Sequence, residues 1–412
     1  MHIAFISHEF PPDTGGGGIG TYLDQITALL AHAGHAVEVF CGAGSASGTS
    51  RRADGVQVYR VSAETAEQFR AAVAPVFSAR HALAPFDVME ANDFDAPANA
   101  IKRAHPDLPC VIKLHTPRFC IDELHNHAPA LAQRARMLAG ALRRGQWPHA
   151  PAPIRSTPAA REELAALALA DEIAAPSRAI AVAAQDWVPE ADGKASVFPY
   201  PYVPPAALLA IPAGGATGRI TYLGRLEERK GVVDLADAIP SVLSAHPGAR
   251  FRFIGRAMPS PRHGQDMRTY LESRLGPAAA AVEFTGPVAP AELPRLLAET
   301  DLLVAPSHWE SFGLVCCEGL AAGRAVVGSA AGGMAEILDQ GRCGLLVRPR
   351  SPARLGEAII ALLPDENRRR ELGRSGRERI LQHYSAATVL AAQLASYQRA
   401  IARRAAPIPP AP

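Results

Sequence analysis

Residues 305–323 read APSHWESFGLVCCEGLAAG, and this stretch decides the fold. It begins at the end of a short apolar run, residues 302–305, which is typical of a buried strand. It ends in small and apolar residues, 313–322, that indicate a helix. Two carboxylates lie eight positions apart, Glu310 on the loop and Glu318 inside the expected helix. The pattern predicts a strand–loop–helix unit of an α/β sheet, with acidic side chains on both sides of the helix start.

The start of this helix is a candidate phosphate site. Free N–H groups at Phe312, Gly313 and Leu314 would point at the loop, and the positive end of a helix attracts an anion. A phosphate with hydroxyl-rich groups on either side would satisfy these N–H groups together with Glu310 and Glu318. The alternative interpretation is a solvated loop glutamate and a surface helix glutamate.

Length and composition narrow the class of protein. A chain of 412 residues, 48% of them hydrophobic, is long enough for two domains with large cores. Its 42 basic and 40 acidic residues nearly balance, which gives no reason to expect a nucleic-acid partner. Six scattered cysteines without a CxxC pair favour reduced thiols. The first residues read as a strand and no stretch reaches the length of a membrane span, so we expect a cytoplasmic protein, with contact to the inner membrane face left open.

A glycine-rich loop follows the first expected strand. Residues 15–20 formally match GxGxxG, but that dinucleotide fingerprint needs its first glycine directly after the strand, and here seven residues intervene. The better interpretation is a flexible loop in which the backbone at Gly16, Gly17 and Gly18 comes close to a diphosphate. A plain surface loop is the alternative.

Polar residues follow two more expected strands of the first half. Residues 86–91 lead into Asp93 and Asp95, an Asp-x-Asp pair that can hold a divalent metal, although two carboxylates are few ligands. Because ligands bind outside the carboxyl ends of the strands in such sheets, we prefer a loop that lines the binding cleft, on the side where an acceptor substrate would lie. We predict no metal site. Residues 109–114 lead into His115, which would lie at the cleft edge with a mobile proton near neutral pH and a donor for a hydroxyl group. A loop-anchoring histidine is the alternative.

Two cations bracket a tight loop in the second half. Arg225 and Lys230 lie between an expected strand and an expected helix. A planar guanidinium and a point-charge ammonium beside a helix start suit a diphosphate, whereas ordinary surface charges are the alternative. We expect Arg229, which lies between them, to be solvated. Gly255 and Val288 follow the next two expected strands and would reach the same edge of the sheet.

In this order the motifs resemble those of the retaining glycosyltransferases of family 4, and the resemblance covers nearly the whole chain. Its signature is the spacing of Glu310 and Glu318. It implies an α/β protein with the GT-B fold, in which two doubly wound Rossmann-like domains face each other across a cleft and a C-terminal helix returns to the first domain. One departure is Tyr200-Pro201-Tyr202, where the family usually has Asn-Gly.

The resemblance also implies a role for each candidate residue. The donor sugar would contact Glu310 and His115, and the ribose would contact Glu318. The phosphates would meet the glycine loop, the cations and the helix-start amides: Gly16, Gly17, Gly18, Arg225, Lys230, Gly255, Phe312, Gly313 and Leu314. Backbone groups near Val288 would frame the base. The implied reaction moves a sugar from a UDP- or GDP-sugar to a hydroxyl of a glycan, a lipid-linked or a small-molecule acceptor, with no metal and no further cofactor.

We expect an acceptor-side domain over residues 1–198, a linker over 199–218, a nucleotide-sugar domain over 219–382, a returning helix over 383–404 and a disordered tail over 405–412. Residues 128–158 are basic and irregular, and they indicate either an amphipathic helix that docks on an anionic membrane or acceptor, or a solvated helix. Two other functions stay open for the same architecture: a nucleotide-sugar epimerase and a non-catalytic nucleotide-sugar-binding protein.

Overall fold

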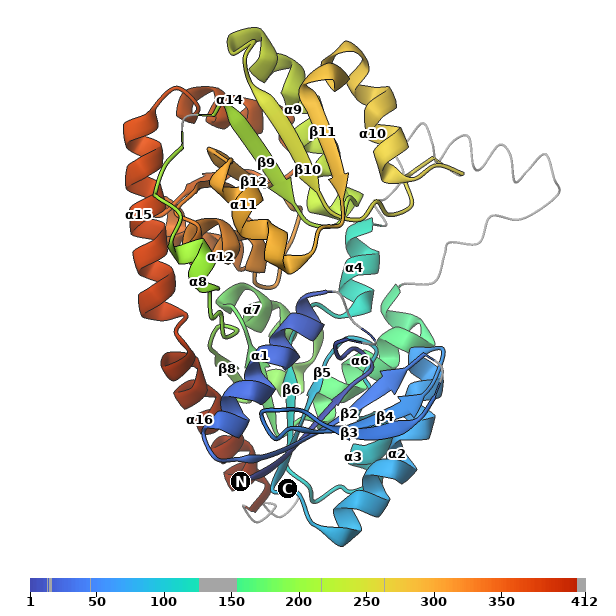
Figure 1. The fold of residues 1–412 in the computed structure, drawn as a ribbon. Helices are drawn as coiled ribbons and strands as arrows, with labels where there is room; N and C mark the ends of the chain where they lie inside the picture. Colours follow the sequence, from blue (N-terminus) through green and yellow to red (C-terminus); the bar gives the residue numbers. More distant parts are fainter. Residues whose placement is uncertain are drawn as a thin grey trace, which may run out of the picture.

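Two α/β units are stacked one above the other in the computed structural model, which describes residues 1–12, 14, 17–44, 46–125, 154–215, 217–262 and 264–405 (Figure 1). The lower unit in Figure 1 contains an eight-stranded sheet, and the upper unit contains a six-stranded sheet. Apolar strands pack against helices on both faces of each sheet. The predicted fold class is confirmed.

The first sheet has the strand order β3-β4-β2-β1-β5-β6-β7-β8, and its pairs are parallel except for β3 with β4. The strands are β1 His2–Ser7, β2 Ala36–Ala43, β3 Gly48–Arg51, β4 Gln57–Ser62, β5 Val88–Asn92, β6 Cys110–Lys113, β7 Glu172–Ala175 and β8 Ala195–Val197. The helices of this unit are α1 Gly18–His32, α2 Ala66–Leu83, α3 Asn99–Ala104, α4 Arg118–His125, α6 Pro158–Leu169 and α7 Arg178–Trp187.

The second sheet has the order β11-β10-β9-β12-β13-β14 and all its pairs are parallel. The strands are β9 Arg219–Leu223, β10 Arg250–Ile254, β11 Val282–Gly286, β12 Leu302–Ala305, β13 Ala325–Ser329 and β14 Leu345–Val347. The helices in this later part of the chain are α8 Ala206–Leu209, α9 Val232–Ala245, α10 Met267–Leu275, α11 Leu293–Ala298, α12 Leu314–Ala321, α13 Met334–Ile337, α14 Pro352–Leu362, α15 Glu366–His383 and α16 Ala386–Ala405. The last of them, α16, packs on the first unit.

The strand order fixes where a ligand can bind. In the first sheet β1 lies between β2 and β5, and in the second sheet β9 lies between β10 and β12. Ligands of doubly wound sheets bind outside the carboxyl ends of the strands where the order reverses, so the loops after β1, β9 and β12 lie at these positions. The two edges face each other, because Ser311 after β12 donates a hydrogen bond of 2.8 Å to the carbonyl oxygen of His115 after β6.

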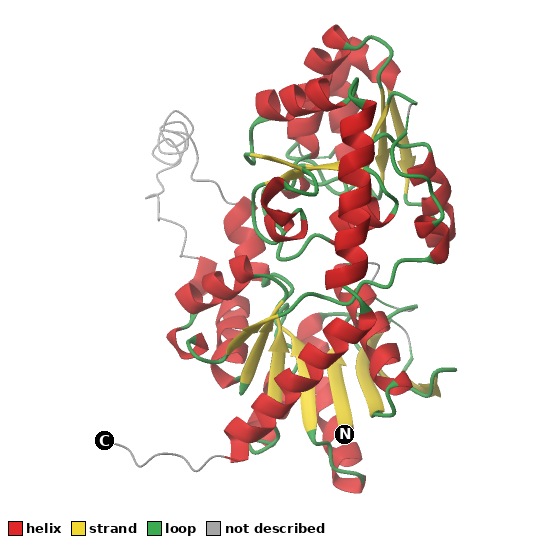
Figure 2. Cartoon of the chain, turned by 90° about the vertical axis from the view of Figure 1, so that its left-hand side faces the viewer, coloured by secondary structure: helices red, strands yellow, loops and turns green. Residues whose placement is uncertain are grey.

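The last helix returns to the first unit, where α16 packs against α1 and the middle of the sheet (Figure 2). Two fully buried carboxylates hold it there. Glu90 on β5 accepts hydrogen bonds from Gln393 at 2.6 Å and from Tyr397 at 2.8 Å. Glu172 on β7 pairs with Arg399 at 2.8 Å and with Arg403. The helix is therefore fixed by charge-assisted bonds inside the core.

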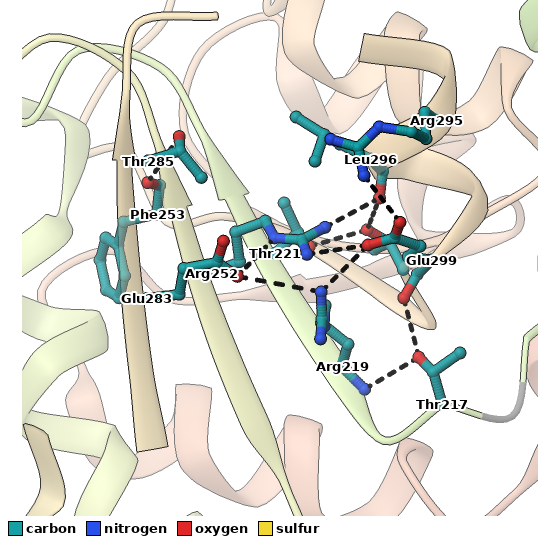
Figure 3. Close-up of polar contacts among 11 residues, drawn as sticks. Thr217, Arg219, Thr221, Arg252, Phe253, Glu283, Thr285, Arg295, Leu296 and Glu299 are labelled. Atoms are coloured by element: carbon teal, nitrogen blue, oxygen red, sulfur yellow. Dashed lines mark hydrogen bonds and ion pairs between the residues drawn. The ribbon is translucent and has the colours of Figure 1, made fainter. Parts of the chain in front are cut away.

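An ion-pair network connects residues of β9, β10 and α11 in the second unit (Figure 3). Glu299 accepts from Arg219 at 3.1 Å, from Arg252 at 2.8 Å and from Arg295 at 2.9 Å. Arg219 is the first residue of β9, so these charges sit at the amino-terminal side of the strands. Glu299 is thus an ion-paired carboxylate at the end of the sheet opposite to Glu310.

Some predictions match the structure in detail and others do not. Ser177 is the N-cap of α7, and its side chain accepts a hydrogen bond from the N–H group of Ile180. The strands β3, β4 and β8 are not predicted by the sequence patterns. The strand β3 is exposed throughout, β8 has only three residues, and β4 has only two buried positions among its six. The domain boundaries stay a prediction, and most of residues 128–158 lie outside the described residues. Among the helices that the structure describes, none is long and apolar enough to cross a bilayer.

Candidate active site

The centre of the candidate site is a pair of opposite charges. The Lys230 ammonium contacts Oε1 of Glu310, and the Arg229 guanidinium lies 3.7 Å from the same oxygen. Burial raises the pKa of Glu310, but the two cations outweigh it, so the pKa of this carboxyl lies below its usual range. Burial lowers the pKa of Lys230 more than Glu310 raises it. Two predicted residues, 80 positions apart, are therefore in contact.

A chain of charges extends from this pair to the surface. Arg229 donates to Glu227 at 2.9 Å, and Glu227 also accepts from Arg225 at 3.2 Å. The prediction that Arg229 is solvated is wrong: its side chain is 5% exposed. It is buried because it also donates to the carbonyl oxygen of Trp309 at 3.0 Å, which ties the β9 loop to the β12 loop. Arg225, in contrast, is half exposed.

Two glycines allow these loops to come close. A Cβ on Gly231 would lie 2.1 Å from the carbonyl oxygen of Pro306, and a Cβ on Gly332 would lie 1.9 Å from the carbonyl oxygen of Glu310. Both glycines have a left-handed backbone, with φ of 72° and 65°. The positions of Lys230 and Glu310 therefore depend on contacts between backbones that no other residue type permits.

The helix start next to Glu310 has free donors. Helix α12 begins at Leu314 with Gly313 as its N-cap, and no hydrogen bond among the described residues uses the N–H groups of Phe312, Gly313 or Leu314. The first unit approaches this point, since a Cβ on Gly18 would lie 4.0 Å from Cδ1 of Leu314. Gly17 precedes α1 as its N-cap, whereas Gly16 lies outside the described residues.

Glu318 lies one turn into α12, because the helix begins at Leu314. Burial raises the pKa of Glu318 to about 7. Hydrogen bonds from hydroxyl groups would stabilise its charged form. Gly255 follows β10 and donates to the carbonyl oxygen of Gly286, and Val288 follows β11. Both lie at the carboxyl edge of the sheet.

His115 is held by the carboxylate of Asp93 and by the ring of Tyr200. Its backbone N–H donates to Asp93 at 2.9 Å, and Asp93 also accepts from Thr116 at 3.2 Å. Thr116 has a strained φ of 109°, which this buried carboxylate stabilises. Tyr200 stacks on the imidazole at 4.9 Å. Burial, helped by the nearby Lys113, holds the pKa of His115 well below its usual value, so the prediction of a mobile proton near neutral pH is wrong.

The Asp-x-Asp pair is occupied by protein partners. Asp93 binds the backbone beside His115, and burial raises its pKa to about 7. Asp95 forms two bonds of 2.7 Å with Arg118. Within the described ranges no three His, Cys, Asp or Glu side chains are grouped as metal ligands. These two carboxylates therefore position the loop next to His115 rather than standing free.

Two further contacts across the cleft are not predicted from the sequence. The carboxylate of Glu336 accepts from the N–H groups of Arg178 and Ala179 at 3.1 and 3.2 Å, which caps α7 from the other unit. Ser177 donates to the carbonyl oxygen of Ser311 at 2.7 Å. Glu336 follows a glycine turn that opens a helix, and that is the only sequence signal for its position.

Two family profiles match consecutive parts of the chain. Residues 17–201 match a "Glycosyl transferase 4-like domain", and residues 217–365 match "Glycosyl transferases group 1". The chain belongs to the GT-B glycosyltransferases of family 4.

Several known glycosyltransferases are similar to this one in sequence. Glycogen synthase of Mycobacterium tuberculosis is 33% identical over 178 residues, which is 43% of this chain and 42% of that protein. D-inositol 3-phosphate glycosyltransferase of Corynebacterium glutamicum is 34% identical over 185 residues, 44% of each. The matches thus span less than half the length of these relatives.

Solved structures show the same fold over the whole chain. Sucrose-phosphate synthase from Thermosynechococcus elongatus has a TM-score of 0.73 at 21% identity, covering 97% of this chain and 99% of that one. The HepE protein of Anabaena, crystallised with UDP-glucose, has a TM-score of 0.63 at 19% identity, covering 96% of this chain and all of that one.

Proposed function

We propose that this family 4 glycosyltransferase moves a hexose from a nucleoside diphosphate sugar to an acceptor hydroxyl, with retention of the anomeric configuration. The contact between Lys230 and Glu310, beside the free amides of α12, carries the proposal. It places a cation, an anion and unpaired N–H donors next to one another at the switch point of the second sheet, where ligands of such sheets bind.

Each group has one task in this proposal. Lys230, Arg225 and the N–H groups at the start of α12 bind the diphosphate, while Glu318 accepts hydrogen bonds from the ribose. Gly255 and Val288 lie on the path of the nucleotide along the strand ends. Gly17 and Gly18 close over the phosphates from the first unit, as the proximity of Gly18 to Leu314 supports.

Catalysis in this proposal is electrostatic. Negative charge develops on the diphosphate as the bond to the sugar breaks, and a cation held in a buried site stabilises that charge more than it stabilises the substrate. Glu310 and His115 hold the sugar while its anomeric carbon gains oxocarbenium character. We assign no covalent nucleophile. The acceptor hydroxyl attacks the face that the diphosphate leaves, its oxygen bonds to the anomeric carbon as the bond to the phosphate oxygen breaks, and its proton passes to the departing phosphate oxygen, so the configuration is retained.

The proposed reaction uses protein cations in place of a divalent metal, because Asp93 and Asp95 are engaged by the backbone and by Arg118. The donor is a UDP- or GDP-sugar, and the acceptor is a glycan, a lipid-linked or a small molecule. The proposed location is the cytoplasm, since six free cysteines fit a reducing compartment. Contact of residues 128–158 with the inner membrane face stays a prediction.

A turnover experiment tests this function. The protein is incubated with radiolabelled UDP- and GDP-sugars without acceptor, and the products are separated. We expect slow release of free sugar and nucleoside diphosphate for one donor. Isomerisation of the sugar would point to an epimerase, and tight binding without turnover would point to a sensor; either result contradicts the proposal.

Variants connect the activity to the site. Glu310→Gln should lower turnover by about 100-fold or more, the size of effect seen when one stabilising group of a site is removed. Glu299→Gln is the matched control, because Glu299 is also paired with arginines but lies toward the opposite edge of the sheet. Equal activity of the two variants would contradict the role of Glu310.

A further inference from the structure

The hydroxyl of Tyr200 lies against a carbonyl oxygen, a ring nitrogen and the side chain of Ser311, and the first of these partners fixes the direction of its hydrogen bonds. It lies 2.5 Å from the carbonyl oxygen of Leu114 and 2.8 Å from Nδ1 of His115. A carbonyl oxygen can only accept, so the single phenolic proton points to Leu114. The phenolic oxygen is then left to accept a hydrogen bond from the imidazole, which requires the N–H group to be at Nδ1 of His115.

This arrangement determines what the other ring nitrogen can do. The ring is neutral, because burial and Lys113 keep the pKa of His115 well below its usual value. A neutral imidazole with a proton on Nδ1 has a lone pair on Nε2. Nε2 of His115 is buried and has no hydrogen-bond partner among the described residues. An unsatisfied buried acceptor of this kind costs free energy until a donor meets it.

The neighbourhood places this acceptor beside the proposed sugar site. Ser311, the residue after Glu310, donates to the carbonyl oxygen of His115 at 2.8 Å. Tyr200 also contacts Phe312 at 4.9 Å, so the same ring touches both the histidine and the start of α12. The aromatic ring of Tyr22 meets His115 edge-on at 5.1 Å and limits its rotation.

We infer that Tyr200 is a positioning residue that fixes the tautomer of His115, so that Nε2 accepts a hydrogen bond from a hydroxyl of the donor sugar. The inference rests on the proposed function and narrows its substrate class. The enzyme selects sugars with a free hydroxyl facing His115. It discriminates against sugars that are deoxygenated at that carbon and against those that carry a carboxylate there, because a carboxylate brings acceptor oxygens against a lone pair.

The test combines two variants with a panel of donors. Tyr200→Phe removes the phenolic oxygen and keeps the ring. Tyr202→Phe is the matched control, because Tyr202 is equally buried and its hydroxyl has no hydrogen-bond partner in the part of the chain that the structure describes. The panel contains the preferred nucleotide-hexose, its monodeoxy analogues position by position, and the corresponding uronate. The readouts are kcat and KM for each donor and the 15N chemical shifts of His115, which report the tautomer.

We expect the wild type and Tyr202→Phe to show the Nδ1-protonated tautomer and to lose about tenfold in kcat/KM for one deoxy donor, the usual effect of one hydrogen bond. In Tyr200→Phe this loss should shrink to less than threefold, because the ring is free to exchange its tautomer.

An Nε2-protonated ring in the wild type would overturn the inference, as would unchanged discrimination in Tyr200→Phe. The 15N chemical shifts of His115 in the wild type test the predicted tautomer even if Tyr200→Phe does not fold. A wild type that turns over no donor contradicts the proposed function instead, and the spectrum then still tests the role of Tyr200.

Discussion

Replacing Lys230 by methionine tests how the charged centre of the cleft works. The substitution keeps most of the side-chain volume but leaves Glu310 paired with Arg229, at 3.7 Å, among the cations that the structure describes. Breaking a buried ion pair typically costs about 3–5 kcal/mol of stability, and the remaining arginine should keep the loss toward the lower figure. Loss of a cation that stabilises developing charge costs roughly 3–4 kcal/mol in the transition state, which is about 100- to 1000-fold in kcat/KM.

The assay compares this variant with Lys102→Met. Lys102 is also a lysine in an ion pair, 2.8 Å from Asp171, and its side chain is 5% exposed against 20% for Lys230. It lies at the opposite end of the first sheet, next to the start of β6. Urea unfolding should show similar destabilisation of the two variants, whereas only Lys230→Met should lose donor hydrolysis and transfer. Wild-type kcat/KM in Lys230→Met, or an equal loss in Lys102→Met, would refute the reasoning.

Three further perturbations have defined outcomes. Lys113 is buried without a hydrogen-bond partner among the described side chains, and burial lowers its pKa to about 7. Between pH 7 and the ordinary pKa of lysine, the unfolded chain binds one more proton than the folded chain, so the free energy of unfolding rises with pH, by roughly 5 kcal/mol at most. Urea unfolding of Lys113→Met should lack this rise. The same dependence of the unfolding free energy on pH in wild type and Lys113→Met would contradict the assignment. Glu172→Ala should destabilise the protein by about 3 kcal/mol and speed amide exchange in α16, while exchange at the wild-type rate would show that Glu172 does not hold the helix. Gly332→Ala should reduce stability and activity together, because its Cβ meets the backbone of Glu310, whereas Gly34→Ala, also at positive φ but with no atom within 4 Å, should cost only about 1–2 kcal/mol and keep its turnover.

The charged centre could be predicted from the sequence because its residues follow strands. Each loop lies directly after a recognisable apolar run, and carboxyl ends of parallel strands meet at one edge, so Lys230 and Glu310 meet although 80 positions separate them. Most strands were predictable because their apolar pattern is local, whereas the return of the last helix to the first unit was expected only from the resemblance to the family.

The remaining features depend on contacts that no local pattern encodes. Arg229 stands in a run of charges and looks solvated, but the β12 loop folds over it and supplies a carbonyl oxygen. Burial, which no local sequence pattern encodes, lowers the pKa of His115 and keeps its imidazole neutral. The role of Tyr200 depends on a bond to a residue 85 positions earlier. Asp93 has the residue type and spacing of a metal ligand, but in the fold it accepts a hydrogen bond from the N–H group of His115, after the neighbouring strand β6.

A crystal structure with the preferred nucleoside diphosphate sugar tests the central claim most directly. We expect the diphosphate within about 3 Å of the Lys230 ammonium and of the N–H groups of Gly313 and Leu314, with the hexose against Glu310. A diphosphate bound elsewhere, with the contact between Lys230 and Glu310 untouched by the ligand, would contradict the account.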